Sequence, residues 1–251
     1  LIKGSAYLEK FDKANVFVFD KTGTLTKGNF AVEAVYPEEK RDEILALAAI
    51  VEKQSNHPIA VSIKKAYGKE IADGYVVEDI AGKGIKAVGE HTVLCGNEKL
   101  MNAFGVEYVP SDGVGTVVYI AKDGAFLGYI VIADEVKPEA KETIEYLNSI
   151  GARTVMLTGD NERIARHVAK KLGLTEFKAS LLPQNKVEEV DRLLKEKKQS
   201  DVLCFVGDGI NDAPVLMKSD IGISMGGVGS DAAIEASDIV LMYDDLRCIE
   251  K

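Results

Sequence analysis

The chain has 251 residues, of which 46% are hydrophobic and 28% charged, a composition typical of a water-soluble globular protein with one large or two small domains. Its 31 Lys and Arg against 40 Asp and Glu give a formal net charge of -9, which argues against a nucleic acid partner held through its phosphates. No apolar run approaches the roughly 18 residues that a membrane helix needs.

The cysteine spacing indicates the redox environment of the chain, and its first residue bears on whether the sequence is a fragment. Cys95, Cys204 and Cys248 are widely separated, so neither a disulfide framework nor a CxxC metal site is expected, as suits a reducing cytosol. The chain begins with Leu1 and shows no leader pattern, and we therefore expect a fragment excised from a longer protein.

Three short apolar runs predict buried parallel strands that end in polar residues. Residues 16–19 precede Asp20, residues 155–157 precede the TGD sequence at 158–160, and residues 202–206 precede Gly207 and Asp208. Helical patterns after Pro138, over 164–172 and after Pro183 separate these runs. The alternation predicts an α/β, doubly wound parallel sheet. Ligands bind at the carboxyl ends of such strands, where we expect convergence of Asp20, Thr158, Asp160 and Asp208.

Residues 29–127 have a different pattern. An amphipathic helix is predicted near residues 44–51 and a second after Pro58, followed by short strands around 75–77, 92–94 and 116–120. This pattern indicates an α+β domain inserted into the first one. The outer domain would then be discontinuous, made of residues 1–28 and 128–251.

The heptapeptide DKTGTLT at residues 20–26 combines a carboxylate at a strand end with a turn rich in hydroxyls and backbone donors. Such a carboxylate can attack a phosphoryl group, although an aspartate here also fits a simple turn cap. Phosphoryl transfer further needs Mg²⁺ on hard oxygen ligands and a cation on the phosphate. The candidates for the metal are Asp20, Asp208 and the Thr22 carbonyl, with Asn211 and Asp212 nearby, and those for the phosphate are Thr158 and Lys186.

DKTGTLT at 20–26, TGD at 158–160 and GDGINDAP at 207–214 together resemble the signature set of the P-type ATPases, which are members of the haloacid dehalogenase-like superfamily. The resemblance implies that Asp20 forms an aspartyl-phosphate, that Lys186 and Thr158 bind the phosphoryl group, and that Asp20, Asp208 and the Thr22 carbonyl coordinate Mg²⁺. It extends the catalytic set to the other motif positions Lys21, Thr22, Gly159, Asp160, Asn211 and Asp212. Lys186 is also consistent with a solvated residue in the first turn of a helix.

Position 22 separates two kinds of enzyme. Soluble phosphatases of the superfamily usually carry a second aspartate two residues after the nucleophile, and this chain has Thr22 there. Without that general base we expect a long-lived phosphoenzyme and poor hydrolysis of phosphate esters. A free-standing capped phosphatase and a non-enzymatic module that binds nucleotide or a partner domain remain the alternatives.

Within the inserted domain, Glu52, SNHP at 55–58, GKG at 82–84 and GN at 96–97 resemble the nucleotide-binding domain of heavy-metal-transporting P-type ATPases. The resemblance implies ATP binding by Glu52, His57, Gly82, Gly84, Gly96 and Asn97. Glycines would let the purine approach the backbone, although they also fit turns, and a His before Pro also fits a helix start. The GxGxxA patterns at 82–87 and 227–232 lack the βαβ context of a dinucleotide site.

The resemblance covers essentially the whole chain and implies the cytoplasmic part of a pump. Its partners would be ATP and the membrane and actuator domains of the same protein, with the transported heavy-metal cation bound outside this chain. The segment around Ser230 is more similar to the zinc, cadmium and lead subgroup than to the copper and silver one. Hinges near residues 28 and 128 are expected to bring the γ-phosphate of ATP to Asp20.

Overall fold

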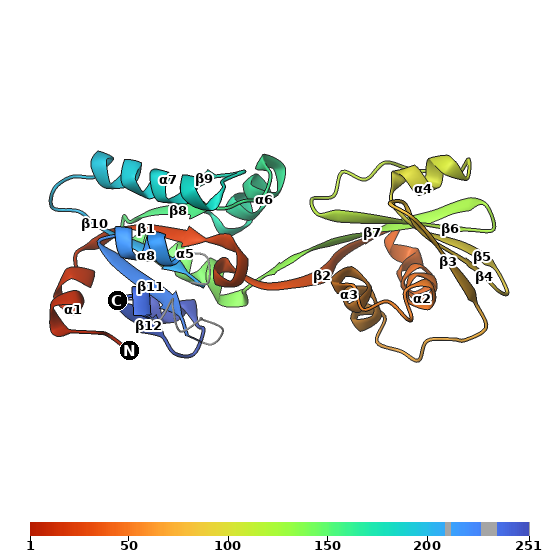
Figure 1. Ribbon diagram of the computed structural model, residues 1–251, viewed down its shortest axis with the longest axis horizontal. Helices are drawn as coiled ribbons and strands as arrows, with labels where there is room; N and C mark the ends of the chain where they lie inside the picture. Colours follow the sequence, from red (N-terminus) through yellow and green to blue (C-terminus); the bar gives the residue numbers. More distant parts are fainter. Residues whose placement is uncertain (209–211, 227–234, 251) are drawn as a thin grey trace. The chain divides into compact units, whose positions relative to one another are not determined.

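The structure is a computed structural model that describes residues 1–208, 212–226 and 235–250 (Figure 1). The chain divides into two compact units: unit 1 is Leu1–Gly28 with Val136–Lys251, and unit 2 is Asn29–Glu135. The sequence patterns place the second boundary between residues 127 and 128, whereas in the structure unit 2 ends at Glu135. Strand β7 (Ala125–Val136) pairs with its neighbour in unit 2 as far as Ile132, so the chain leaves that sheet only after it.

Unit 1 is built on a six-stranded sheet in the order β12-β11-β10-β1-β8-β9, in which every adjacent pair is parallel. Strand β1 lies in the middle, between β8 and β10, and the strand order reverses there. At such a switch point the connections leave the carboxyl ends of neighbouring strands toward opposite faces of the sheet, which is where ligands of this fold class bind. The strands are β1 (Ala14–Asp20), β8 (Arg153–Leu157), β9 (Glu176–Lys178), β10 (Val202–Gly207), β11 (Ile221–Met225) and β12 (Ile239–Leu241).

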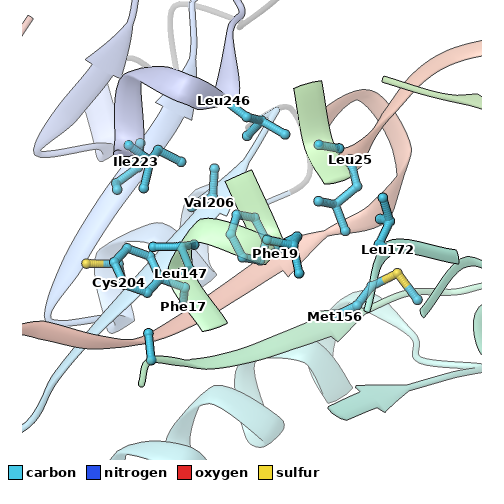
Figure 2. Packing of buried hydrophobic residues seen from close by; sticks show 14 of the residues in the cluster. Phe17, Phe19, Leu25, Leu147, Met156, Leu172, Cys204, Val206, Ile223 and Leu246 are labelled. Carbon is cyan, nitrogen blue, oxygen red and sulfur yellow. The ribbon is translucent and has the colours of Figure 1, made fainter. Parts of the chain in front are cut away.

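Both faces of this sheet are covered, as the continuous apolar runs predict. Phe17 and Phe19 point into one core with helices α5 and α6, shown in Figure 2, while Val16 and Val18 point into the opposite core with α7 and α8. The helices and short turns of unit 1 are α1 (Ser5–Phe11), η1 (Lys21–Leu25), α5 (Pro138–Ser149), α6 (Glu162–Leu172), α7 (Pro183–Glu196), α8 (Ala213–Lys218) and η3 (Leu246–Ile249).

Unit 2 is a six-stranded sheet in the order β2-β7-β6-β5-β4-β3, whose registered pairs from β3 to β7 are antiparallel. Helices α2 and α3 cover one face and α4 the other (Figure 1). Besides β7, its elements are β2 (Thr26–Tyr36), η2 (Glu38–Lys40), α2 (Arg41–Val51), α3 (Pro58–Tyr67), β3 (Val76–Ile80), β4 (Gly84–Val88), β5 (Thr92–Gly96), α4 (Glu98–Ala103) and β6 (Thr116–Lys122). Among all residues that the structure describes, no helix is both long and apolar enough for a membrane span.

Candidate functional site

Asp20 is the last residue of β1, and its side chain is buried. The loop that follows, Lys21–Leu25, is closed by the Thr26 hydroxyl, which donates to the Lys21 carbonyl at 3.0 Å. Gly23 in this loop has φ +76°, and a Cβ on it would lie 2.7 Å from Oδ2 of Asp208. Only glycine therefore lets the loop approach Asp208 this closely.

Three carboxylates converge beside this loop: Asp20, Asp208 and Asp212 each contribute an oxygen, all within 4.8 Å of one another. Asp208 directly follows β10, and Asp212 precedes α8. Gly207 leaves space for the Asp212 side chain, since a Cβ on Gly207 would lie 2.8 Å from Oδ2 of Asp212. Hard carboxylate oxygens are the ligands that Mg²⁺ prefers, so this donor set fits that ion.

Lys186, in the first turn of α7, points into the carboxylate cluster. Its Nζ donates to Oδ1 of Asp20 at 2.6 Å and to Oδ1 of Asp212 at 3.1 Å. Burial alone would lower the pKa of Lys186, but the two carboxylates outweigh it and raise that pKa. This lysine is therefore not a solvated surface residue.

The pKa of Asp20 is raised to about 6, first by burial and then by the charge of Asp212, while Lys186 opposes both effects. A nucleophilic carboxylate must be ionised, so its charge has to be supported by cations at neutral pH. Lys186 supplies one such cation, and a metal ion on the three carboxylates would supply more.

The TGD sequence follows β8, the strand that pairs with β1. Thr158 is buried, and its hydroxyl accepts a hydrogen bond from the backbone N–H of Asp160 at 3.1 Å. The Asp160 carboxylate pairs with the buried ammonium of Lys21 at 3.1 Å, which ties the loop after β8 to the loop after β1. Gly159 and Thr22 are exposed in these two loops. Asn211, the glycine pattern at 227–232 and Ser230 lie outside the described residues.

Lys137 is a residue that the sequence did not point to. Its side chain is 5% exposed and pairs with Asp244 at 2.9 Å, and its backbone N–H donates to the carbonyl of Leu25 at the end of the loop after β1. It thereby joins that loop to the segment after β12. A lysine directly before Pro138 was the available signal, since this proline begins α5, but lysines are mostly exposed and no pattern marks a buried one.

In unit 2, Glu52 and His57 flank the turn between α2 and α3. Nδ1 of His57 accepts from the backbone N–H of Ile59 at 3.3 Å and so caps α3, as the helix-start interpretation predicts. With Nδ1 used as an acceptor, the neutral ring carries its proton on Nε2. Burial raises the pKa of Glu52. Burial also raises the pKa of the Cys95 thiol on β5, and the charge of Glu52 adds to this effect.

Gly82, Gly84, Gly96 and Asn97 form one corner of that sheet. The Asn97 amide donates to the Gly82 carbonyl at 3.0 Å. A Cβ on Gly84 would lie 2.5 Å from Cα of Gly96, and one on Gly96 would lie 2.3 Å from the carbonyl oxygen of Lys83. Two of the three glycines are thus required by the close approach of β4 and β5 itself, while Gly82, with φ +70°, faces open space.

Comparison with known proteins identifies the family of the chain. Residues 14–220 match the family of haloacid dehalogenase-like hydrolases. The chain is 50% identical to a zinc-transporting ATPase of Synechocystis over 97% of its own length and 34% of the relative, and 49% identical to a cadmium, zinc and cobalt-transporting ATPase of Bacillus subtilis over 97% and 36%. A crystal structure of a zinc-transporting PIB-type ATPase in an E2.Pi state superimposes with a TM-score of 0.83 at 38% identity, covering 99% of this chain and 42% of that one.

The chain thus spans about a third of the length of the curated relatives that it matches. The family match covers β1 and the loops after β8 and β10, and it includes all three clustered carboxylates. The chain belongs to the haloacid dehalogenase-like hydrolase family, and its motifs and relatives are those of heavy-metal-transporting P-type ATPases.

Proposed function

We propose that this chain is the phosphorylation and nucleotide-binding unit of a P-type ATPase that exports a heavy-metal cation. ATP would transfer its γ-phosphate to Asp20, and the aspartyl-phosphate would drive transport through membrane and actuator domains elsewhere in the same protein. The names of the relatives favour zinc or cadmium over copper as the transported ion. In such a pump the chain would lie on the cytoplasmic side of the membrane.

The observation that carries the proposal is the pairing of Asp20 with Lys186 at 2.6 Å, beside two further carboxylates at the carboxyl ends of parallel strands. A buried carboxylate next to a fixed cation is placed both to attack phosphorus and to have the new negative charge neutralised. The lysine would move from Asp20 to the phosphoryl oxygens as charge accumulates there. Thr158 would donate its hydroxyl to the same oxygens.

Asp20, Asp208 and the carbonyl of Thr22 would hold Mg²⁺. When bound, this ion would neutralise charge on the carboxylates and on the incoming phosphate. Lys21, Asp160 and Asp212 would stabilise the positions of the groups that react or bind phosphate. The Lys21–Asp160 ion pair keeps the nucleophile loop in place, and Asp212 orients Lys186.

ATP would bind in unit 2 with its base near Glu52 and His57 and with Gly82, Gly84, Gly96 and Asn97 beside it. The carboxylate of Glu52 can accept a hydrogen bond from a purine, and the Nε2–H of His57 can donate one to it. The space beside Gly82 is open, so a ligand could approach its backbone. Gly84 and Gly96 instead allow β4 and β5 to pack closely at the corner of the sheet where Gly82 lies.

The test is phosphorylation by γ-labelled ATP with Mg²⁺, quenched in acid. We expect a label that hydroxylamine removes and that Asp20→Asn abolishes, because an acyl phosphate is the hydroxylamine-sensitive product. A label that survives Asp20→Asn, or rapid multiple turnover of a generic phosphomonoester by the chain alone, would refute the proposal. The latter result would favour the capped phosphatase.

A further inference from the structure

Lys64 lies on α3, next to the turn that joins α2 to α3. Its half-buried Nζ donates to the carbonyl of Ser55 at 2.6 Å and to the carbonyl of Lys53 at 3.2 Å. Both carbonyls belong to the turn that carries Glu52 at one end and His57 at the other. One ammonium group thus holds two peptide groups of this turn in place.

Ser55 connects this contact to both predicted nucleotide ligands. Its hydroxyl oxygen accepts from the backbone N–H of His57 at 3.3 Å. The backbone N–H of Ser55 also donates to the carbonyl of Glu52 at 3.1 Å. A shift of the Ser55 carbonyl would therefore move Glu52 and His57 together.

Lys53 holds a different segment. Its Nζ donates to the carbonyl of Ile71 at 3.0 Å and to Oδ1 of Asp73 at 2.5 Å, in the loop before β3. The two lysines therefore stabilise different parts of the structure. The side chain of Lys53 binds the loop before β3, whereas the side chain of Lys64 binds backbone carbonyls of the turn between α2 and α3. Hydrogen bonds from a charged donor are about twice as strong as neutral ones, so Lys64 holds the carbonyls of Lys53 and Ser55 more firmly than a neutral donor would.

We propose that Lys64 is a positioning residue for the nucleotide site, which fixes the turn at 53–55 so that Glu52 and His57 are presented together to the base of ATP. The inference rests on the proposed function, because it assigns Lys64 to the same site. The two hydrogen bonds of Lys64 go to the backbone of the turn. Its loss should weaken ATP binding through a disordered site rather than through a lost ligand contact.

The experiment compares Lys64→Met with Lys65→Met, its exposed neighbour on the same helix, by calorimetric titration of the chain with ATP. We expect Lys64→Met to raise Kd about tenfold, as the loss of charge-assisted hydrogen bonds predicts, and Lys65→Met to leave Kd within about twofold. Lys64→Arg keeps the charge and the hydrogen-bond donors, and we expect this variant to retain most of the wild-type affinity for ATP. Phosphorylation of Asp20 at saturating ATP should be unchanged in all three variants.

A double-mutant cycle with His57→Gln separates positioning from general loosening of the fold. If Lys64 acts through the turn, the effect of Lys64→Met shrinks when His57 is already replaced. An unchanged Kd in Lys64→Met, equal effects of Lys64→Met and Lys65→Met, or full additivity with His57→Gln would overturn the inference. Failure of the wild-type chain to bind ATP would instead refute the proposed function, and the inference with it.

Discussion

The two candidate sites are built on different principles. In unit 1, Asp20, Lys186 and Asp212 are buried or nearly so and hold one another by ion pairs at the ends of central strands. In unit 2, His57 and Asn97 are exposed and are fixed mainly by hydrogen bonds with the backbone around them. Chemistry that develops charge needs a preorganised, poorly solvated site, whereas reversible binding of a nucleotide does not.

The difference predicts how the two units respond to substitution. Changes in unit 1 should alter rates and ionisation by large factors, because each removes a charge from a low-dielectric site. Changes in unit 2 should alter affinity or local packing by smaller amounts.

The largest effect is expected for Lys186→Met. Loss of the cation that pairs with Asp20 removes the group that would stabilise the transferring phosphate, and we expect phosphorylation to slow about 1,000-fold. The matched control is Lys195→Met on the same helix, whose exposed side chain pairs with Asp191. Rapid-quench kinetics at saturating ATP measures both. A slowing of less than tenfold in Lys186→Met would contradict the assignment.

The second effect concerns the lifetime of the phosphoenzyme. Thr22→Asp would place a general base where soluble phosphatases of the superfamily carry one, and we expect the aspartyl-phosphate to hydrolyse about 100-fold faster. Thr22→Asn has the same shape without the base and should leave the lifetime unchanged. The decay of the labelled protein after a chase with unlabelled ATP measures this, and equal decay of the two variants would count against the role of position 22.

The third effect is on stability without Mg²⁺. The pKa of Asp20 is raised from 3.8 to about 6, so its ionised form costs folding free energy that is absent below pH 3.8 and fully present above pH 6. Asp20→Asn should therefore stabilise unit 1 by about 3 kcal/mol at pH 7 and by nothing near pH 4. Urea unfolding followed by circular dichroism measures this difference.

Asp191 provides the control for that measurement. Lys195 and Lys218 lower its pKa to about 2, which is the opposite direction to Asp20. Asp191→Asn should give no stabilisation at pH 7. If both variants gain equally, the gain does not come from the ionisation of Asp20.

The fourth effect tests the glycines of unit 2. Gly84→Ala would force its Cβ against Cα of Gly96, and we expect it to destabilise the β4–β5 corner by about 2 kcal/mol. Gly82→Ala faces open space and should cost only about 1 kcal/mol for its positive φ. Hydrogen exchange of the β4 and β5 amides measures both. Equal costs would mean that close strand packing does not explain Gly84.

Much of unit 1 was predictable because its sequence patterns follow from simple rules. Continuous apolar runs predict strands buried on both faces, and parallel strands bring Asp20 and Asp208 to one edge of the sheet. The partners of Lys186 were harder to assign, since Asp20 lies 166 residues away in the sequence and a lysine near a helix start is usually solvated. The buried Lys137 left no recognisable pattern at all.

Unit 2 was less predictable because its interactions are made by backbone groups. The second boundary lies after Glu135 rather than after residue 127, because β7 continues as one strand to Val136. The glycines were interpreted as room for a purine, yet two of them are required by neighbouring backbone. The contacts of Lys64 with two carbonyls depend on the shape of a turn, which no pattern of side chains encodes.

In the proposed function, the chemistry resides in unit 1 and nucleotide recognition in unit 2. Phosphorylation by acetyl phosphate, which carries no base, should bypass unit 2, so the most direct measurement compares acetyl phosphate with ATP as donors for wild type, His57→Gln and Asp20→Asn. We expect His57→Gln to raise the half-saturating ATP concentration about tenfold, the cost of one hydrogen bond, and to leave acetyl phosphate labelling unchanged. Asp20→Asn should abolish both. Equal loss of both labels in His57→Gln, or any hydroxylamine-sensitive label in Asp20→Asn, would contradict the account.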